Sequence, residues 1–295
     1  MECVPNFSEG RDFAAIARIA EEIASVDAAA ILDRTSDWDH NRTVITFAGA
    51  PDAVAEAAFR AIRCAVQCID LARHLGVHPR IGAADVIPLV PVAGVTLEFC
   101  AQMAAQLGER VWRELRVPVY LYEAAARRPE RRNLANIRRG LFEELREEVQ
   151  RNPERMPDFG EAALHPTAGA CVIGARKFLI AFNINLDTAD VEIARGIARK
   201  IRASSGGLPA VKALGLFLES RGRAQVSTNL TDFEITPLCS IVEAVEAESK
   251  RCGVRVTGTE LIGLIPRAAV TTAGGCDLGI RDEQILENRL EQCLR

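Results

Sequence analysis

The residues best suited to chemistry in this chain surround His78, in the segment Gly76-Val77-His78-Pro79-Arg80-Ile81-Gly82. Imidazole titrates near neutral pH and suits general acid–base catalysis, and the chain has four histidines in 295 residues. Proline disfavours the helical conformation in the residue before it, so Pro79 predicts an extended loop for His78, beside the cation of Arg80. The segment therefore favours proton transfer, although most single histidines are structural or solvated.

A second polar cluster, Asp37-Trp38-Asp39-His40-Asn41-Arg42, carries two carboxylates, an imidazole and a guanidinium within six residues. Such a loop could contact a polar substrate, and it could equally be a hairpin loop closed by hydrogen bonds of its Asp and Asn side chains. It contains one histidine and no standard ligand spacing, so no metal site is predicted.

Small residues and glycines mark a third segment, Gly160 to Gly169, which is followed by Gly174-Ala175-Arg176-Lys177. Small side chains let a flat ligand approach the backbone closely, and Arg176 or Lys177 could pair with an anionic group. The phosphate-binding patterns GxxxxGKS/T and GxGxxG do not occur in the sequence. A fourth polar segment, Val4 to Gly10, is more typical of a helix cap than of a site.

The elements that position these segments occur in the same order twice. In the first half the order strand, helix, strand, strand, helix, strand spans residues 3–6, 12–25, 30–33, 43–47, 51–75 and 85–90. In the second half the same order spans residues 178–184, 189–203, 211–218, 224–230, 237–251 and 254–257. The predicted fold class is therefore α/β (α+β), with two ferredoxin-like β-α-β-β-α-β subdomains.

An extension follows the first repeat. Its patterns predict a helix over 96–115, a strand over 118–123 and a solvated helix over 133–150, where arginine and glutamate dominate. Residues 152–160 hold two prolines, an Asp and a Gly, which is typical of a linker. A terminal helix is expected over 282–290.

The composition sets the class of protein. With 48% hydrophobic and 26% charged residues and a net charge of −4, it is typical of a soluble globular protein and excludes a general nucleic-acid binder. The N-terminus lacks a leader pattern, and no apolar run reaches the roughly 18 residues of a membrane span. The nine cysteines include no CxxC pair, which favours reduced thiols and a cytoplasmic location.

Several long motifs together resemble glutamate formiminotransferase. The resemblance covers roughly residues 1–266, in order, and is carried by residues 2–10, 41–44, 78–85, 174–186, 224–230 and 260–266. It implies two α/β subdomains, residues 1–176 with the catalytic histidine and residues 177–295, with a folate-binding cleft between them. In animals this domain is fused to a cyclodeaminase, and the present chain is expected to be too short to contain one.

The resemblance also implies the reaction. The formimino group of N-formimino-L-glutamate is transferred to N5 of tetrahydrofolate, which gives 5-formiminotetrahydrofolate and L-glutamate in histidine degradation. The family's catalytic histidine corresponds to His78, which can take a proton from N5 and return one to the departing glutamate nitrogen. Tetrahydrofolate is implied as a co-substrate, and a homodimer is implied as the assembly.

Three sets of site residues follow. The catalytic residues are expected to be His78, Asp39 and Arg80. Arg42 and Arg80 could bind the carboxylates of the donor, and an acidic residue among Asp37, Asp39 and Asp85 could stabilise its amidinium. The folate-binding loop implied by the resemblance consists of Gly160, Glu161, Ala162, Ala163, Leu164, His165, Pro166, Thr167, Ala168 and Gly169.

Three alternatives remain open. The same fold could transfer a formyl group instead, because the two donors differ only by NH against O at the transferred carbon. The chain could also be a folate-binding protein without catalytic activity. A metal hydrolase built on Asp37, Asp39, His40 and His78 is the third alternative.

Overall fold

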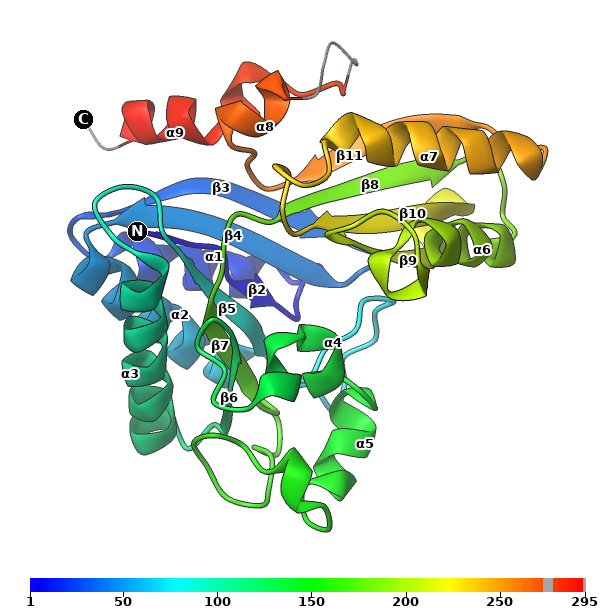
Figure 1. Ribbon diagram of the computed structural model, residues 1–295. Coiled ribbons are helices and arrows are strands. Elements are labelled where there is room, and N and C mark those ends of the chain that lie inside the picture. Colours follow the sequence, from blue (N-terminus) through cyan, green and yellow to red (C-terminus); the bar gives the residue numbers. More distant parts are fainter. Residues whose placement is uncertain (273–277, 294–295) are drawn as a thin grey trace. The chain divides into compact units, whose positions relative to one another are not determined.

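The chain divides into two units, residues 1–176 and residues 177–293, in a computed structural model that describes residues 1–272 and 278–293 (Figure 1). Each unit has its own sheet, its own helices and its own hydrophobic core. The predicted α/β class with two subdomains is confirmed. No helix among the described residues combines the length and the apolar character needed to cross a membrane.

The first unit is built on a mixed sheet. Its strands are β1 (Glu2–Cys3), β2 (Asn6–Phe7), β3 (Ala29–Asp37), β4 (Arg42–Gly49), β5 (Ala84–Val90), β6 (Val119–Glu123) and β7 (Cys171–Ala175). β1 and β2 are two pieces of the predicted first strand, separated at Pro5, and both lie between β4 and β5 in antiparallel pairing. β3 adds antiparallel to β4, and β7 and β6 extend the sheet from β5 in parallel pairing. β7 was not predicted.

Three helices cover one face of this sheet: α1 (Phe13–Ala24), α2 (Pro51–Cys68) and α3 (Leu97–Leu115). The side chain of Asp12 accepts hydrogen bonds from the amides of Ala14 and Ala15, which caps α1. Apolar residues at helical spacing, Ile16, Ile19 and Ile23, are buried. Ile19 and Ile23 share one core with the sheet residues Phe7 and Phe47, which fixes α1 on this face.

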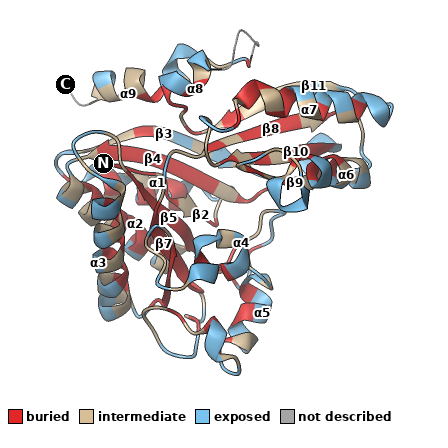
Figure 2. Ribbon diagram, in the orientation of Figure 1, coloured by how far each residue is buried: buried red, intermediate tan, exposed pale blue. Residues whose placement is uncertain are grey.

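The opposite face of β5, β6 and β7 is covered by the extension. Alternate strand residues Tyr120, Tyr122 and Val172 form a core with the helices α4 (Leu134–Ile137) and α5 (Leu141–Glu148). The prediction of one solvated helix over 133–150 is therefore wrong, because Ile137, Phe142, Leu145 and Val149 are buried. Figure 2 shows buried as well as exposed stretches on α5. The many charged residues of this segment masked a short apolar stripe.

The linker predicted over residues 152–160 is also wrong, because the segment belongs to the first unit. The hydroxyl of Tyr120 donates to the carbonyl of Arg155 at 2.6 Å. Arg131 and Asp158 form a buried ion pair at 2.6 Å. The prolines of this segment therefore shape an anchored loop.

The second unit has a four-stranded antiparallel sheet in the order β11-β8-β10-β9. Its elements are β8 (Ile180–Leu186), α6 (Val191–Ile201), β9 (Val211–Leu218), β10 (Arg223–Leu230), α7 (Leu238–Arg251), β11 (Val256–Ile262), α8 (Arg267–Thr271) and α9 (Leu286–Cys293). Ile180, Phe182, Ile184 and Leu186 alternate along β8 and are fully buried with α6 and α7. The terminal helix predicted over 282–290 is a 3-10 turn, Asp282–Gln284, followed by α9.

Candidate functional site

The loop that carries His78 is longer than the sequence predicts, because α2 ends at Cys68 and not near Leu75. Backbone hydrogen bonds join it to the loop of residues 160–169. Leu71 donates to the carbonyl of Thr167 at 2.8 Å, and Ala83 donates to that of Ala168 at 2.9 Å. The structure thus brings the His78 loop and the predicted folate loop side by side within the first unit.

The cluster Asp37–Arg42 forms the loop of the β3–β4 hairpin. The Asp37 carboxylate accepts a hydrogen bond of 2.7 Å from the amide of His40, and Asn41 has a positive φ of 46°. Both observations match the hairpin-loop alternative.

The same hairpin loop also contacts the loop of His78. The Asn41 side chain donates to the carbonyl of Leu75 at 3.0 Å, and Val77 donates its amide to the carbonyl of Asp39 at 3.1 Å. Asn41 also accepts from the amide of Gly10 at 2.8 Å, which anchors the hairpin to the segment that follows β2. These contacts bring together the two polar clusters that lie more than thirty residues apart in the sequence.

His78 and Arg42 form the centre of this arrangement. Nη1 of Arg42 lies 2.5 Å from Nε2 of His78. A guanidinium can only donate, so Nε2 is the acceptor and the imidazole is neutral, with its proton on Nδ1. The ring of His40 lies near that of His78, with 5.9 Å between their centroids.

The surroundings keep His78 neutral. Burial of the imidazole is the main cause that lowers the pKa of His78 well below its usual value, and the positive charges of Arg42 and Arg138 lower it further. Burial and the charge of Arg138 likewise lower the pKa of Arg42 to about 10, so this guanidinium is still charged at neutral pH. The site therefore combines an unprotonated imidazole with permanent cations.

Asp85 shapes the loop from β5. Its side chain is buried, and one carboxylate oxygen accepts hydrogen bonds from the amides of Ile81 at 2.8 Å and Gly82 at 3.2 Å. The other oxygen forms an ion pair with Arg138, which follows α4. Arg138 was missed by sequence reasoning, because it lies in the charged extension and no local pattern distinguishes it from its arginine neighbours.

The side chain of Arg80 hydrogen-bonds to residues other than His78. It is 8% exposed, and its guanidinium donates to Nδ1 of His74 at 2.9 Å and to the Glu143 carboxylate at 2.8 and 3.1 Å. His74, also missed by sequence reasoning, uses its Nε2 toward the carbonyl of Asn41 at 2.8 Å. Arg80 and His74 thus brace the loop against the hairpin and α5.

The predicted folate loop has an anchored end and an open end. Leu164, Ala168 and Gly169 are buried, while residues 161–163 are exposed. Nδ1 of His165 accepts the amide of Ala168 at 3.0 Å, which closes a tight turn. A Cβ at Gly169 would lie 2.2 Å from the carbonyl oxygen of Ile81, so glycine allows this loop to pack against that of His78.

The other predicted residues are dispersed. Gly174 and Ala175 belong to β7, and Lys177 pairs with Asp232 at 2.9 Å in the second unit. Asp39 is buried in the hairpin loop. Within residues 1–272 and 278–293, no three His, Cys, Asp or Glu side chains are grouped to hold a metal ion.

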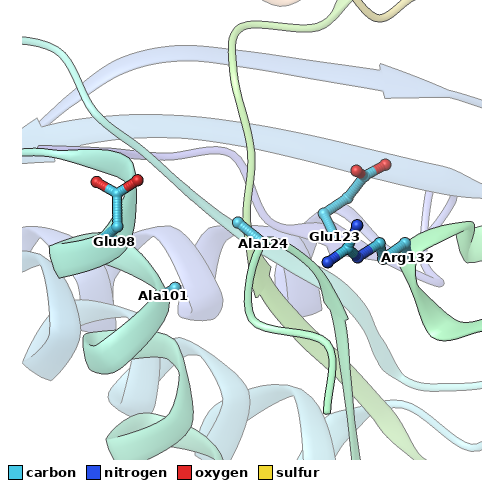
Figure 3. Close-up of a pocket in the computed structure, with 5 residues that line it drawn as sticks. All are labelled: Glu98, Ala101, Glu123, Ala124 and Arg132. Atoms are coloured by element: carbon cyan, nitrogen blue, oxygen red, sulfur yellow. The ribbon is translucent and has the colours of Figure 1, made fainter. Parts of the chain in front are cut away.

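A pocket of about 570 Å³ lies elsewhere in the first unit (Figure 3). Glu98 and Ala101 line it from α3, and Glu123, Ala124 and Arg132 line it at and beyond the end of β6. None of the predicted site residues lines this pocket.

Comparisons with known proteins agree with this architecture. Residues 1–176 match the family described as the formiminotransferase domain, N-terminal subdomain, and residues 181–291 match the formiminotransferase domain. The chain is 44% identical to a glutamate formimidoyltransferase of Streptococcus pyogenes serotype M1, over 98% of both chains. It is 46% identical to one of Thermoplasma acidophilum, over 99% of this chain and 97% of the other.

A mouse formimidoyltransferase-cyclodeaminase is 44% identical over 94% of this chain, which spans 52% of the mouse protein. The family model and the bacterial and archaeal relatives therefore extend over nearly the whole chain. The resemblance seen in the sequence motifs is confirmed, and the chain belongs to the formiminotransferase domain family.

Proposed function

We propose that the protein is a glutamate formimidoyltransferase, which moves the formimino group of N-formimino-L-glutamate to N5 of tetrahydrofolate. Relatives that carry this name are 44% and 46% identical to the chain over nearly its full length. The observation that carries the mechanism is the pairing of a neutral His78 imidazole with Arg42 in the first unit.

His78 serves first as a base. N5 of tetrahydrofolate attacks the amidinium carbon of the donor, a C–N bond forms, and N5 gives up its proton. Nε2 of His78 holds a lone pair for this proton but shares it with Arg42 in the resting protein. A donor carboxylate that draws the guanidinium toward itself leaves Nε2 able to accept the proton.

His78 then serves as an acid. In the second step the bond between the transferred carbon and the glutamate nitrogen breaks, and this nitrogen must gain a proton. The imidazolium formed in the first step is destabilised by its burial and by the charges of Arg42 and Arg138, as the lowered pKa of His78 indicates. It therefore returns its proton readily, and L-glutamate leaves.

Asp39 is the acidic residue that we assign to the cationic amidinium of the donor. It is buried in the hairpin loop, whose backbone contacts the His78 loop. The carboxylates of Asp37 and Asp85 instead hold the turn and the loop by accepting backbone amides. Arg80 is assigned a positioning role, because its guanidinium donates to His74 and Glu143.

We assign the loop Gly160–Gly169 to contact with tetrahydrofolate. Its anchored end packs on the His78 loop, and its residues 161–163 are exposed. A cytoplasmic location, a homodimer and a place in histidine degradation belong to the same proposal. They rest on the family resemblance.

The decisive assay supplies tetrahydrofolate with either N-formimino-L-glutamate or N-formyl-L-glutamate. A preference for the formimino donor supports the proposal, and a preference for the formyl donor favours the formyltransferase alternative. Binding of tetrahydrofolate without turnover of either donor would favour the alternative of a folate-binding protein without catalytic activity. Full activity after exhaustive chelation would eliminate the metal-hydrolase alternative.

A further inference from the structure

A second guanidinium, that of Arg138, is held at the loop of His78 through Asp85. Arg138 follows α4 and forms an ion pair with the buried carboxylate of Asp85, which accepts the amides of Ile81 and Gly82, three and four residues beyond His78. Its charge acts on both Arg42 and His78. Arg42 contacts the imidazole from β4, and Arg138 reaches the same loop from the extension through Asp85; we call Arg42 and Arg138 the arginine pair.

The turn that presents Arg138 is held firmly. Gly140 and Leu141, two and three residues after Arg138, both have a positive φ, of 79° and 56°. A left-handed leucine is uncommon and persists only where the surroundings enforce it. Here the amide of Leu141 donates to the carbonyl of Arg138 at 2.9 Å, and the amide of Phe142 donates to the carbonyl of Arg80 at 3.1 Å. The strained turn thus fastens Arg138 to the His78 loop.

The arginine pair has spare donors. Among the described residues, Arg138 donates from its side chain only to Asp85, and its Nε is buried without a hydrogen-bond partner. The guanidinium of Arg42 donates only to His78 within the same residues. A buried donor without a partner is costly, and an oxyanion can accept from it and from a second guanidinium N–H at once.

The ion pairs point the same way. Asp85 is paired with Arg138, whereas Arg42 forms no ion pair with the described residues, and the carboxylates of Asp85 and Asp37 act on it only from beyond ion-pair distance. A planar carboxylate matches the fork of a guanidinium in two parallel hydrogen bonds. An anion at this position would also draw Arg42 from Nε2 of His78.

We propose that the arginine pair is a carboxylate-binding site, in which Arg138 is a specificity-determining residue for the glutamyl part of the donor. This rests on the proposed function, because the donor and the product L-glutamate share these carboxylates. Arg138 would bind the donor, and it would leave the tetrahydrofolate-binding loop unaffected.

The test compares Arg138→Gln with Arg139→Gln by calorimetric titration of L-glutamate into the purified full chain. Arg139 is the matched control, because it is exposed, adjacent and carries the same charge, and its side chain makes no hydrogen bond with the described residues. The dissociation constant should rise by about 10- to 100-fold in R138Q, the loss expected of a charge-assisted hydrogen bond. In R139Q it should change by less than about twofold.

Steady-state kinetics separate binding from a structural role. The KM for N-formimino-L-glutamate should rise with the dissociation constant in R138Q, while the KM for tetrahydrofolate stays within about threefold of its wild-type value. A parallel rise of both KM values would indicate a disturbed loop and would overturn the inference. Unchanged L-glutamate binding in R138Q, or no binding by the wild-type protein, would also overturn it.

The two proposals can fail separately. If the wild-type protein binds L-glutamate through Arg138 but transfers no formimino group, the proposed function is refuted and the carboxylate-binding site is still supported. If circular dichroism shows that R138Q is unfolded, Arg138→Lys carries the test, because lysine keeps the charge toward Asp85 and loses the planar fork. A rise of about fivefold or more in its dissociation constant supports the proposal, and an unchanged constant overturns it.

Discussion

Nε2 of His78 accepts a hydrogen bond of 2.5 Å from Nη1 of Arg42, a residue 36 positions earlier in the chain. This contact defines the tautomer of the imidazole, and together with burial it favours the neutral form. We infer that in the resting site the cation of Arg42 occupies the lone pair of the base, Nε2 of His78. A substrate carboxylate that binds Arg42 would release this lone pair.

Replacement of His78 by alanine should lower kcat by about 10²- to 10⁴-fold, the usual contribution of one general acid–base residue. Binding of tetrahydrofolate should survive, because the loop of residues 160–169 is held by backbone contacts. The measurement is kcat with both substrates saturating, together with the dissociation constant of tetrahydrofolate. A variant that keeps nearly full activity would rule out His78 as the proton carrier.

The pH dependence of activity should follow the lowered pKa of His78. Burial lowers this pKa most, followed by the charges of Arg42, Arg138 and His40, and a hydrogen bond with the backbone of Pro79 opposes them. The base form then persists below the ordinary histidine pKa of about 6.5, so the acidic limb of kcat/KM should lie below that pH.

The variant Arg42→Gln tests the cause of this shift. Removal of the adjacent cation should raise the pKa of His78 and move its titration to higher pH. Nuclear magnetic resonance of the imidazole in the free protein measures this without reference to turnover. Titration of His78 at the same pH in both proteins would show that Arg42 does not set its pKa.

Stability should fall in mild acid. Burial is the first cause that lowers the pKa of His74, His78 and His165 in the folded state. Between those values and the unfolded value of about 6.5, the unfolded chain binds more protons, so the free energy of unfolding decreases as the pH falls through this window. Urea titrations at pH 7.5 and pH 5.5 should show the loss, and His78→Asn should reduce it.

Arg80 and Glu143 should contribute unequally to stability, although they form one ion pair. The Glu143 side chain is 59% exposed, so Glu143→Gln should cost less than about 1 kcal/mol. Arg80→Met also removes the donors to Nδ1 and the carbonyl of His74 in a buried region, and should cost about 2–3 kcal/mol. Denaturant unfolding of both variants measures the difference, and equal losses would contradict this account.

Gly82→Ala should be strongly destabilising. A Cβ at this position would lie 2.0 Å from the backbone oxygen of Ala170, which cannot move without breaking the contact between the His78 loop and the start of β7. The expected loss exceeds about 2 kcal/mol. Gly196 in α6 is the control, because a Cβ there meets nothing within 4 Å, and Gly196→Ala should stabilise the helix by about 0.5–1 kcal/mol. A tolerated Gly82→Ala would show that the two segments can separate.

Local sequence patterns determined most of the elements. Helical spacing of Ile16, Ile19 and Ile23 predicted α1, because such a pattern reports burial of one face, and a strand predicted over residues 178–184 is observed as β8 over Ile180–Leu186. Pro79 predicted that His78 lies outside a helix. The same kind of reasoning failed over residues 133–160, where a short apolar stripe lies within a charged segment and turns are anchored by distant partners.

Tertiary structure alone decided the partners of His78. The sequence motifs named His78, Arg42 and Asp85 as site residues, and nothing local could show that Arg42 donates to the imidazole or that Asp85 holds the loop. Arg138 and Glu143 reach the site from the extension, more than fifty residues beyond Asp85 and Arg80. Local conformation depends on residues that are neighbours in the sequence, so sequence patterns can predict it. The electrostatic field and the hydrogen bonds at the His78 imidazole depend on which distant segments pack against it, so only the tertiary structure decides them.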